Sequence, residues 1–458
     1  MNNQKFSTLS LSKSMIDNLN KLGYKEMTAI QAKALPYILE NKDLVAQAKT
    51  GSGKTAAFGI GLLKKLDINN KNIQSLILCP TRELADQIAK ELRRIARFKG
   101  NIKILILSGG IPFKPQVDSL RHSAHIIVGT PGRVLKHITH GSLNLENIET
   151  LVLDEAHRML DMGFIEEIKE VITNIPRKRQ TLLFSATYPE EMLKLSSIIQ
   201  KNAINVKTNS IESENKITEY FYKVPFKSKL NAIIKVLSTH KPENVIIFSN
   251  TKAQVKDIAK FLVKRDIDAL AIHGDLEQYK RTDVLVQFAN KSCSVMVATD
   301  VAARGLDIKE LDMVINYDIP EDEDTYIHRI GRTARAGKEG KAFTFHTEHE
   351  TFKISEYENK TRIFTDTSSL KMDNKYSLQA PNYTLVIEGG KKDKIRPGDI
   401  LGALTKEAGI EGKYIGKIAI YDRQSFVAIS REIINEAHSS LKKGKIKGKR
   451  FPIWILGL

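Results

Sequence analysis

Two short segments carry residues whose types and spacing fit phosphate chemistry. Ala48–Thr55 reads Ala-Lys-Thr-Gly-Ser-Gly-Lys-Thr, a glycine-rich loop that ends in lysine and threonine. Leu151–His157 reads Leu-Val-Leu-Asp-Glu-Ala-His, an apolar run that ends in two acids. Backbone N–H groups of a loop without bulky side chains cradle phosphate oxygens, and a following helix N-terminus favours their negative charge. Together the two segments predict a nucleoside triphosphate hydrolase.

Each residue type in these segments has a chemical role under this hypothesis. Lys54 is expected to reach the outer phosphates, and the Thr55 hydroxyl and Asp154 to hold Mg²⁺. Glu155 is expected to orient and deprotonate the attacking water. Ala48 stands where the loop pattern has glycine, and it still leaves room for the phosphates. The predicted nucleotide-binding residues of the loop are Ala48, Thr50, Gly51, Ser52, Gly53, Lys54 and Thr55.

The elements that must position these residues are indicated by two series of apolar runs. Near-continuous Ile, Leu and Val runs, each followed by turn residues and a helical segment, are typical of buried parallel strands. The first series extends from Leu44 to Phe184, and the second extends from Val245 to Phe345 without a phosphate loop of its own. We expect two doubly wound α/β domains over residues 1–208 and 209–365, the second completing a site formed at the first.

A smaller unit is expected over residues 382–458, after a linker at 366–381. Its segments run in the order strand, helix, strand, strand, helix, strand, which is the layout of an RNA-recognition motif. Such sheets usually carry two exposed aromatic residues, but here Phe426 is present and Ile429 occupies the second position. Trp454, in the last strand, is expected in the core. We therefore predict that RNA is bound by a basic edge rather than by the sheet face.

The net charge of +18 over 458 residues is the one global anomaly. It favours a polyanionic partner, and nucleic acid is preferred to a membrane because no basic amphipathic helix with a bulky apolar face stands out. No run approaches the 18 or more apolar residues of a membrane span, and the N-terminus lacks a signal-peptide core. Cys79 and Cys293 have no metal-ligand spacing, so reduced thiols and a cytoplasmic location are expected. No oligomerisation element stands out, so a monomer is expected.

Further motifs complete the pattern. They are Gly23–Gln31, Pro80–Ala85, Gly109–Gly110, Thr130–Arg133, Ser185–Thr187, His273–Asp275, Gln278–Arg281, Ala298–Asp307 and His328–Arg335. With them, residues 1 to 365 resemble a DEAD-box RNA helicase, which implies two RecA-like domains. Lys394–Thr405 and Gly444–Lys449 resemble the RNA-binding domain of the bacterial DbpA-type helicases, so the resemblance spans essentially the whole chain.

One residue departs from the family pattern. His157 stands where the family name requires Asp. Related DEAH-box translocases carry His there, but they lack the adenine-reading glutamine motif to which Gln31 belongs. His157 is expected to face Ser185 and Thr187, where the family couples hydrolysis to RNA handling. Hydrolysis itself is expected to survive, because metal binding and base chemistry need only the two acids.

The resemblance implies roles for the remaining motif residues. Contacts with the nucleotide are implied for Tyr24, Gln31, Gly305 and Asp307, catalysis for Lys54, Glu155, Arg332 and Arg335, and coupling for His157, Ser185, Thr187 and His328. RNA contacts are implied for Arg82, Gly109, Gly110, Thr130, Arg133 and Thr299. The residues expected at the basic edge are Lys391, Lys392, Lys394, Arg396, Lys442, Lys443, Lys445, Lys447, Lys449 and Arg450.

These observations predict an RNA helicase that uses ATP and Mg²⁺ to unwind short duplexes locally. By the resemblance, its C-terminal unit would direct it to a hairpin of large-subunit ribosomal RNA near the peptidyl-transferase region, in pre-ribosomal particles during assembly. One alternative, motivated by His157, is an ATP-gated RNA clamp or annealing chaperone with weak unwinding. Another is a DNA helicase, which only the net charge prompts.

Overall fold

The computed structural model describes residues 5–48, 51–188, 190–208, 217–303, 311–334, 339–358 and 361–457. Four residues of the predicted sites lie outside these ranges: Thr50, Gly305, Asp307 and Arg335. The described residues form two compact units, one ending at residue 208 and the other beginning at residue 217. Within the described ranges, no helix is both long and apolar enough to cross a membrane.

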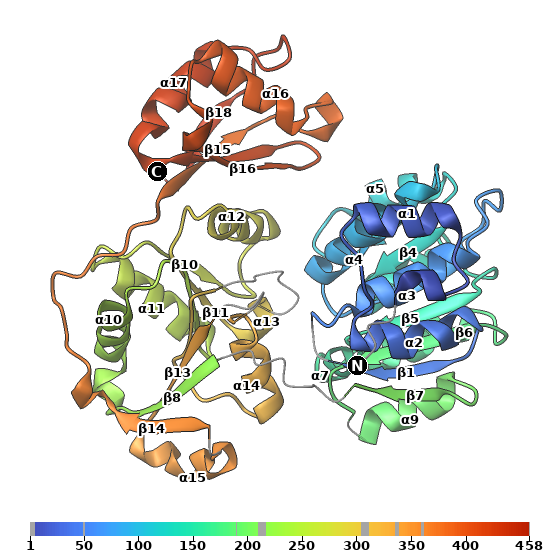
Figure 1. Ribbon diagram of the computed structural model, residues 1–458, viewed down its shortest axis with the longest axis horizontal. Coiled ribbons are helices and arrows are strands. Elements are labelled where there is room, and N and C mark those ends of the chain that lie inside the picture. The colour runs from blue at the N-terminus through green and yellow to red at the C-terminus, as the bar shows by residue number, and fades with distance from the viewer. Residues whose placement is uncertain are drawn as a thin grey trace. The chain divides into compact units, whose positions relative to one another are not determined.

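A seven-stranded parallel sheet, with strand order β3-β4-β2-β5-β6-β1-β7, forms the centre of the first unit. Its strands are β1 (Leu44–Gln47), β2 (Ser75–Leu78), β3 (Ile104–Leu107), β4 (Ile126–Gly129), β5 (Thr150–Asp154), β6 (Gln180–Ser185) and β7 (Ile204–Lys207). Its helices are α1 (Lys13–Lys21), α2 (Ala29–Leu39), α3 (Lys54–Lys65), α4 (Arg82–Ile95), α5 (Phe113–Leu120), α6 (Pro131–Thr139), α7 (Ala156–Asp161), α8 (Ile165–Thr173) and α9 (Glu190–Ile199). Helices cover both faces of the sheet (Figure 1).

This sheet separates two apolar cores, which explains the near-continuous apolar runs in its strands. Ile77 of β2 packs in one core together with Val152 of β5. Its neighbour Leu76 packs in the other core together with Leu151. Because successive side chains of a strand point to opposite faces, a strand that is covered on both sides must be apolar throughout.

The second unit contains a sheet of the same kind, with order β10-β11-β9-β12-β13-β8-β14 and parallel pairing throughout. Its strands are β8 (Ile217–Lys223), β9 (Val245–Phe248), β10 (Ala269–Ile272), β11 (Val295–Ala298), β12 (Met313–Asn316), β13 (Gly340–His346) and β14 (Arg362–Asp366). Its helices are α10 (Lys229–His240), α11 (Lys252–Val263), α12 (Gln278–Ala289), α13 (Asp300–Ala303), α14 (Glu323–Ile330) and α15 (Thr351–Ile354). The prediction of two doubly wound parallel sheets is confirmed, and β7, β8 and β14 are additional strands that the sequence analysis missed.

The segment predicted as a linker, 366–381, packs along the second sheet domain. Leu370 is 7% exposed and belongs to the core of that domain. Leu378 pairs with Ile267 in an isolated β-bridge, and its N–H donates to the carbonyl of Asp266 at 3.2 Å. This segment is therefore held by apolar and backbone contacts.

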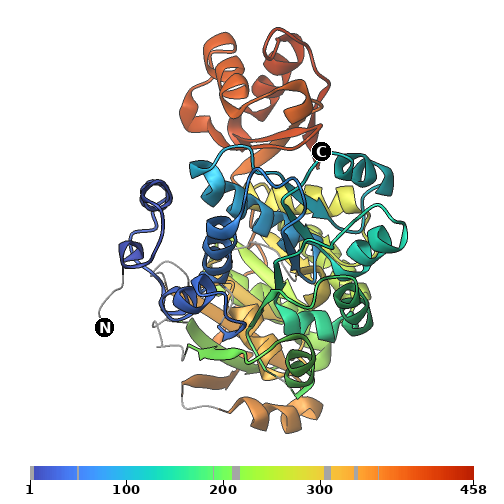
Figure 2. The same cartoon turned by 90° about the vertical axis from the view of Figure 1, so that its right-hand side faces the viewer.

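The C-terminal part of the second unit has the predicted strand–helix–strand–strand–helix–strand order. The elements are β15 (Asn382–Ile387), α16 (Pro397–Gly402), β16 (Ile415–Ile420), β17 (Ser425–Ser430), α17 (Ile434–Lys443) and β18 (Ile453–Leu456). The strands form an antiparallel sheet in the order β16-β17-β15-β18. Both helices lie on the same side of this sheet (Figure 1 and Figure 2). Ile400 and Leu441 belong to the same buried core as Leu385 and Val427.

The other face of this small sheet packs against α12. Val286 of α12 contacts a cluster formed by Val386, Phe426 and Leu456. The Thr384 hydroxyl accepts a hydrogen bond from the Asn290 side-chain amide at 3.1 Å, at the end of the same helix. The centre of the sheet face is thus covered, which accounts for the 1% exposure of Phe426.

The prediction that Trp454 lies in the core is wrong, since 38% of it is exposed. Ile453 and Ile455, its two neighbours in β18, contact the core beneath the helices. The alternation of side chains along a strand then turns Trp454 to the opposite face.

Candidate active site and RNA-binding surfaces

The predicted site residues of the first unit follow the carboxyl ends of its strands, which meet at one edge of a parallel sheet. The phosphate loop, the two acids and Ser185 follow or end β1, β5 and β6. Arg82, Gly109 and Thr130 follow β2, β3 and β4. Because the strand order is β3-β4-β2-β5-β6-β1-β7, the predicted nucleotide residues occupy one half of this edge and the predicted RNA residues the other.

The described part of the phosphate loop has the backbone that a phosphate cradle needs. Gly51 and Gly53 have φ angles of 85° and 96°, and α3 begins immediately afterwards at Lys54. A Cβ atom on Gly53 would lie 2.5 Å from Nε2 of Gln31, so only glycine fits there. The buried Ser52 hydroxyl has no hydrogen-bond partner among the described residues. The loop therefore offers backbone N–H groups, a helix N-terminus and an unused hydroxyl to an anion.

Gln31 connects the phosphate loop to the start of α2. Its side-chain amide donates to the carbonyl of Gly53 at 3.1 Å, and its oxygen accepts from the N–H of Thr28 at 2.9 Å. The side chain is 1% exposed. Since a primary amide carries two N–H groups, the Gln31 side chain has a second donor beside the one that contacts Gly53.

Tyr24, in the segment before α2, is held by residues of α4. Its hydroxyl donates to the Glu91 carboxylate and accepts from Arg94 at 2.9 Å. The Arg94 guanidinium also lies over the ring, 5.3 Å from the centroid, and the ring of Phe6 meets Tyr24 edge-on. Burial and the hydrogen bond to Glu91 raise the pKa of Tyr24 to about 12, so the phenol stays neutral.

The two acids of the predicted catalytic pair lie beside Lys54. Its ammonium lies 2.8 Å from Oε1 of Glu155, and the two side chains are 5% and 3% exposed. Burial raises the pKa of Asp154 to about 6. Burial would also raise the pKa of Glu155, but Lys54, Arg158 and His157 outweigh it and hold that pKa well below its usual value. Glu155 is therefore ionised.

The donor set fits a magnesium ion that is bound mainly through a nucleotide. Thr55, in the first turn of α3, follows the lysine that contacts Glu155, and Asp154 ends β5. No group of three or more His, Cys, Asp or Glu side chains gathers to form a metal site in the described part of the chain. Mg²⁺ commonly takes one or two protein oxygens and completes its shell with phosphate oxygens and water.

His157 bridges the acidic pair and the end of β6, as expected from the sequence. Its Nδ1 lies 2.8 Å from Oγ of Ser185, and its Nε2 lies 3.6 Å from Oε2 of Glu155. The Ser185 hydroxyl donates to the carbonyl of Thr187 at 2.5 Å, so Nδ1 of His157 must be the donor to Ser185. An unbroken chain of polar contacts thus runs from Glu155 to Thr187.

In the half of the edge that contains the predicted RNA residues, the Arg133 side chain is bound to other residues of the same unit. Its guanidinium donates to the carbonyl of Ile111 and to the side chain of Gln116 at 3.0–3.1 Å, and it lies over the ring of Phe113. Arg82 differs, because its buried Nη1 has no hydrogen-bond partner among the described residues. Gly110, which has φ 74°, is exposed.

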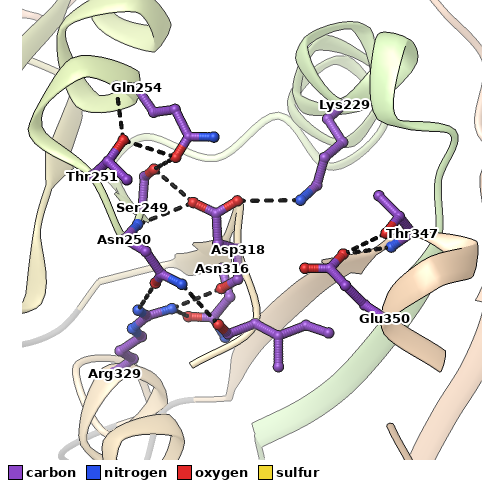
Figure 3. Close-up of polar contacts among 11 residues, drawn as sticks. Lys229, Ser249, Asn250, Thr251, Gln254, Asn316, Asp318, Arg329, Thr347 and Glu350 are labelled. Atoms are coloured by element: carbon purple, nitrogen blue, oxygen red, sulfur yellow. Dashed lines mark hydrogen bonds and ion pairs between the residues drawn. The ribbon is translucent and has the colours of Figure 1, made fainter. Parts of the chain in front are cut away.

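The second unit holds its own strand ends together through a buried arginine (Figure 3). The side chain of Arg329, 1% exposed, donates to both carboxylate oxygens of Asp300 at 2.6–2.7 Å. It also donates to the Asn250 side chain and to the backbone carbonyl of Asp318, both at 2.9 Å. The Asp318 carboxylate accepts in turn from Lys229 at 3.2 Å. These contacts fix α14 against the ends of β9, β11 and β12.

Two residues of this unit with predicted roles, His328 in coupling and Arg332 in catalysis, lie close to Arg329 in sequence. His328 precedes it and is half-buried, whereas Arg332 is 8% exposed. Thr299 is equally buried, next to Asp300. The network around Arg329 thus sets the backbone positions of the motifs that contain them.

Two loops of the C-terminal domain, together with the last turn of α17, form a basic edge. All ten basic residues predicted there are exposed. The ammonium of Lys447 donates to the carbonyl of Lys394 at 2.8 Å, which joins the loops. One apolar residue from each loop, Ile395 and Ile446, is buried in the core of the domain. These two anchors hold the loops in place while their charges face solvent.

Comparisons with known proteins agree with this geometry. Residues 28–195 match the DEAD/DEAH box helicase family, residues 228–337 match the helicase conserved C-terminal domain, and residues 384–455 match the DbpA RNA binding domain. The chain is 48% identical to the ATP-dependent RNA helicase DbpA of Escherichia coli K12 over 460 residues, which cover 98% of this chain and 99% of that protein. The chain belongs to the DEAD-box RNA helicases of the DbpA type.

This DEAD-box enzyme is an ATP-dependent RNA helicase with a C-terminal RNA-binding domain. It is also 43% identical over 359 residues to the helicase CshA of Geobacillus kaustophilus, covering 78% of this chain and 76% of that protein. Among solved structures, S. cerevisiae Dbp5 bound to RNA and ADP BeF3 matches with a TM-score of 0.72 and 29% identity, over 80% of this chain and 96% of that one.

The sequence analysis of this helicase missed two buried arginines that shape its sites. Arg158 lies 3.8 Å from Glu155 and helps to keep it ionised, and Arg329 braces the second sheet domain. Arg158 directly follows the motif that ends at His157, and Arg329 stands inside the motif His328–Arg335, so each is one residue away from a position to which a role was given. The useful signal is a long cationic side chain within an otherwise apolar or glycine-rich motif, because a buried charge must find partners.

Proposed function

We propose that this helicase locally unwinds short RNA duplexes and is directed by its C-terminal domain to a hairpin of large-subunit ribosomal RNA near the peptidyl-transferase region. Its work would be the remodelling of neighbouring RNA during large-subunit assembly. The observation that carries this proposal is the basic edge, in which two anchored loops and the end of α17 expose ten cationic residues on a domain of the DbpA RNA-binding type. Such an edge binds phosphates, and the shape of a folded RNA can select among targets.

At the first domain, we propose that Gln31 and Tyr24 bind adenine and that the loop from Ala48 to Thr55 binds the phosphates. In this proposal Lys54 leaves Glu155 to contact the outer phosphates of ATP. Glu155, kept ionised by Arg158 and His157, then takes the proton of the attacking water. Mg²⁺, held by Thr55 and Asp154, neutralises charge on the phosphates.

The second domain is proposed to contribute the arginines of its last motif, Arg332 and Arg335, with Gly305 and Asp307 near the ribose. Forked guanidinium groups stabilise charge that develops on a transferred phosphoryl group, typically by ~10³–10⁵ in rate. Hydrolysis that depends on both domains is stimulated by an RNA that binds both, and the coupling must be reciprocal for binding.

The RNA contacts of the two sheet domains are proposed for Arg82, Gly109, Gly110, Thr130, Arg133 and Thr299. Contacts of this kind grip phosphates and 2′-hydroxyls without reading sequence. The contact between His157 and Ser185 would pass the state of the nucleotide to this RNA site, with Thr187 and His328 taking part. We further propose that the protein acts as a monomer in the cytoplasm, where the buried free thiols of Cys79 and Cys293 stay reduced.

The alternative function is an ATP-gated clamp or annealing chaperone. His157 motivates it, since a changed coupling residue could leave hydrolysis intact and strand separation weak. Release of a labelled strand from a short duplex, measured beside ATP turnover, distinguishes the two. ATP-driven release at a rate matching turnover would exclude the clamp.

The proposal is tested by the steady-state ATPase rate with no RNA, with a nonspecific duplex, and with a large-subunit ribosomal RNA fragment that contains the peptidyl-transferase hairpin. Strong stimulation by the ribosomal fragment alone is expected. Equal stimulation by both RNAs would leave the helicase activity standing and reject the ribosomal target. Stimulation by DNA alone would favour the DNA-helicase alternative.

A further inference from the structure

The outward face of the C-terminal sheet has a covered centre. Val386 of β15 lies opposite Phe426 of β17 on one side and opposite Trp454 of β18 on the other. Val386 and Phe426 are each 1% exposed, because Val286 of α12 packs on them. Phe426 therefore cannot offer its ring to a base, although it stands at a position where sheets of this topology usually do so.

Trp454 lies in the same row, on the edge strand β18, and escapes this cover. It is 38% exposed and is the single tryptophan of the chain. Isolated exposed apolar side chains are common on protein surfaces, so exposure alone indicates nothing. An indole is nevertheless the largest aromatic surface that a side chain can present, and its N–H can donate to an acceptor while its face stacks.

The strand that carries Trp454 begins next to the two basic loops. The basic loop that ends at Arg450 leads directly into β18, and the carbonyl of Pro452 accepts from the N–H of Glu388 at 2.9 Å. The ammonium of Lys447 in that loop reaches the carbonyl of Lys394 in the other. An RNA strand whose phosphates lie along the two loops would thus have its next nucleotide at the beginning of β18, beside the indole.

We propose that Trp454 is a stacking site for one unpaired RNA base that adjoins the structured RNA held by the basic edge. This inference rests on the proposed RNA binding by the basic edge and adds the ligand class of a second subsite, a single-stranded flank. Stacking of a base on an aromatic side chain is tolerant of sequence, because every base has a π-face. The site therefore recognises that a flank is unpaired, not which nucleotides it contains.

The test uses the intrinsic fluorescence of the full-length chain, in which all tryptophan emission comes from Trp454. Two RNAs are compared: the peptidyl-transferase hairpin with a short single-stranded extension, and the same hairpin with a blunt end. The extended RNA is expected to quench the emission saturably, in parallel with binding followed by the anisotropy of labelled RNA. The blunt hairpin is expected to bind more weakly, by roughly tenfold, with little quenching.

Substitutions separate stacking from packing. Trp454→Leu is expected to weaken binding of the extended RNA by roughly tenfold, the effect of about one stacked base, and to leave the blunt hairpin unaffected. Trp454→Phe should retain most of the affinity for the extended RNA. Phe226→Leu, which changes an aromatic residue that is 71% exposed elsewhere in the second unit, is the matched control and should change neither affinity.

Several results would overturn the inference. Binding of the extended RNA with unchanged emission would leave the basic edge standing and remove the stacking site. Equal loss of both RNAs in Trp454→Leu, with a lowered unfolding temperature, would show a structural role only. A spectral shift that follows protein concentration instead of RNA would identify a protein contact. Failure of either RNA to bind the full chain would reject both this inference and the proposed function of the basic edge.

Discussion

Asp154 and Glu155 are adjacent in sequence, yet their surroundings shift their pKa values in opposite directions. Burial raises the pKa of Asp154 to about 6. Lys54, Arg158 and His157 overcome the same effect of burial at Glu155. The left-handed backbone of Glu155, with φ 53°, sends the two side chains into these different environments. Neighbouring carboxylates can thus have different roles, one in binding a metal and one as a base.

The raised pKa of Asp154 predicts a pH-dependent requirement for Mg²⁺. In the proposed magnesium site, Asp154 takes up a proton as the pH falls through about 6, and this proton competes with the metal, so more Mg²⁺ is needed on the acid side. We expect the Mg²⁺ concentration that gives half-maximal RNA-stimulated ATPase to rise by up to tenfold for each pH unit below that value. Titrations of Mg²⁺ at several values between about pH 5 and pH 7.5 measure this.

The matched control for this prediction is Asp118→Asn, which removes an exposed carboxylate of the same domain and should leave the pH dependence unchanged. Asp154→Asn should abolish the pH dependence and should also raise the Mg²⁺ concentration that is needed at every pH. A Mg²⁺ requirement that stays constant over the whole pH range would show that Asp154 is ionised throughout and that burial does not govern it.

At the scale of residues, the sequence predicted those parts of the site whose residues are close together in the chain. A glycine loop and a strand ending in two acids are recognisable because their members are close in sequence. The pairing of Lys54 with Glu155 joins residues 101 positions apart, and that of Tyr24 with Glu91 joins residues 67 positions apart. Such contacts depend on which helices pack together, which no short pattern contains.

At the scale of elements, the prediction worked for strands that are covered on both faces. Strands such as β5 (Thr150–Asp154) are buried throughout and read as apolar runs. The missed strands have different patterns, since β7 and β14 are edge strands that include polar residues, and the first four residues of β8 are only half-buried. A strand that is partly exposed has no need of a continuous apolar sequence.

The network that joins elements of the second domain gives a prediction about stability. Arg329→Lys removes a planar group that donates to Asp300, to Asn250 and to the carbonyl of Asp318, and it leaves Asp300 with a single, mobile ammonium. Because lysine keeps the positive charge but leaves buried hydrogen-bond acceptors unsatisfied, the free energy of unfolding of this domain should fall by about 1–3 kcal/mol. Denaturant unfolding monitored by circular dichroism measures the loss.

Arg423→Lys, at an exposed position of the same unit, is the control and should change the free energy of unfolding by less than about 0.5 kcal/mol. ATP turnover by Arg329→Lys should also fall, since Arg332 lies on the backbone that this network positions. Unchanged unfolding combined with lost turnover would mean that Arg329 acts on a ligand and does not brace the fold.

At the scale of the whole molecule, the charge of +18 indicated a polyanion but not where it binds. The basic residues of the C-terminal domain are in two sequence segments, and only the fold brings the segments together through Lys447 and Lys394. Because Ile395 and Ile446 are buried, both loops are already ordered, and less conformational entropy is lost when a ligand binds to them. The fold thereby collects part of the positive charge of the chain on one surface, the basic edge.

That surface predicts a specific change in salt dependence. The triple substitution Lys391→Gln, Lys392→Gln and Lys447→Gln should lower the slope of log affinity against log salt by about 2, which is three phosphate contacts at roughly 0.7 each. It should weaken binding of the ribosomal hairpin while ATP turnover without RNA stays unchanged. The control triple Lys406→Gln, Lys413→Gln and Lys417→Gln removes the same charge from exposed positions of the same domain. Equal slopes for the two triples would mean that net charge, and not the basic edge, determines RNA affinity.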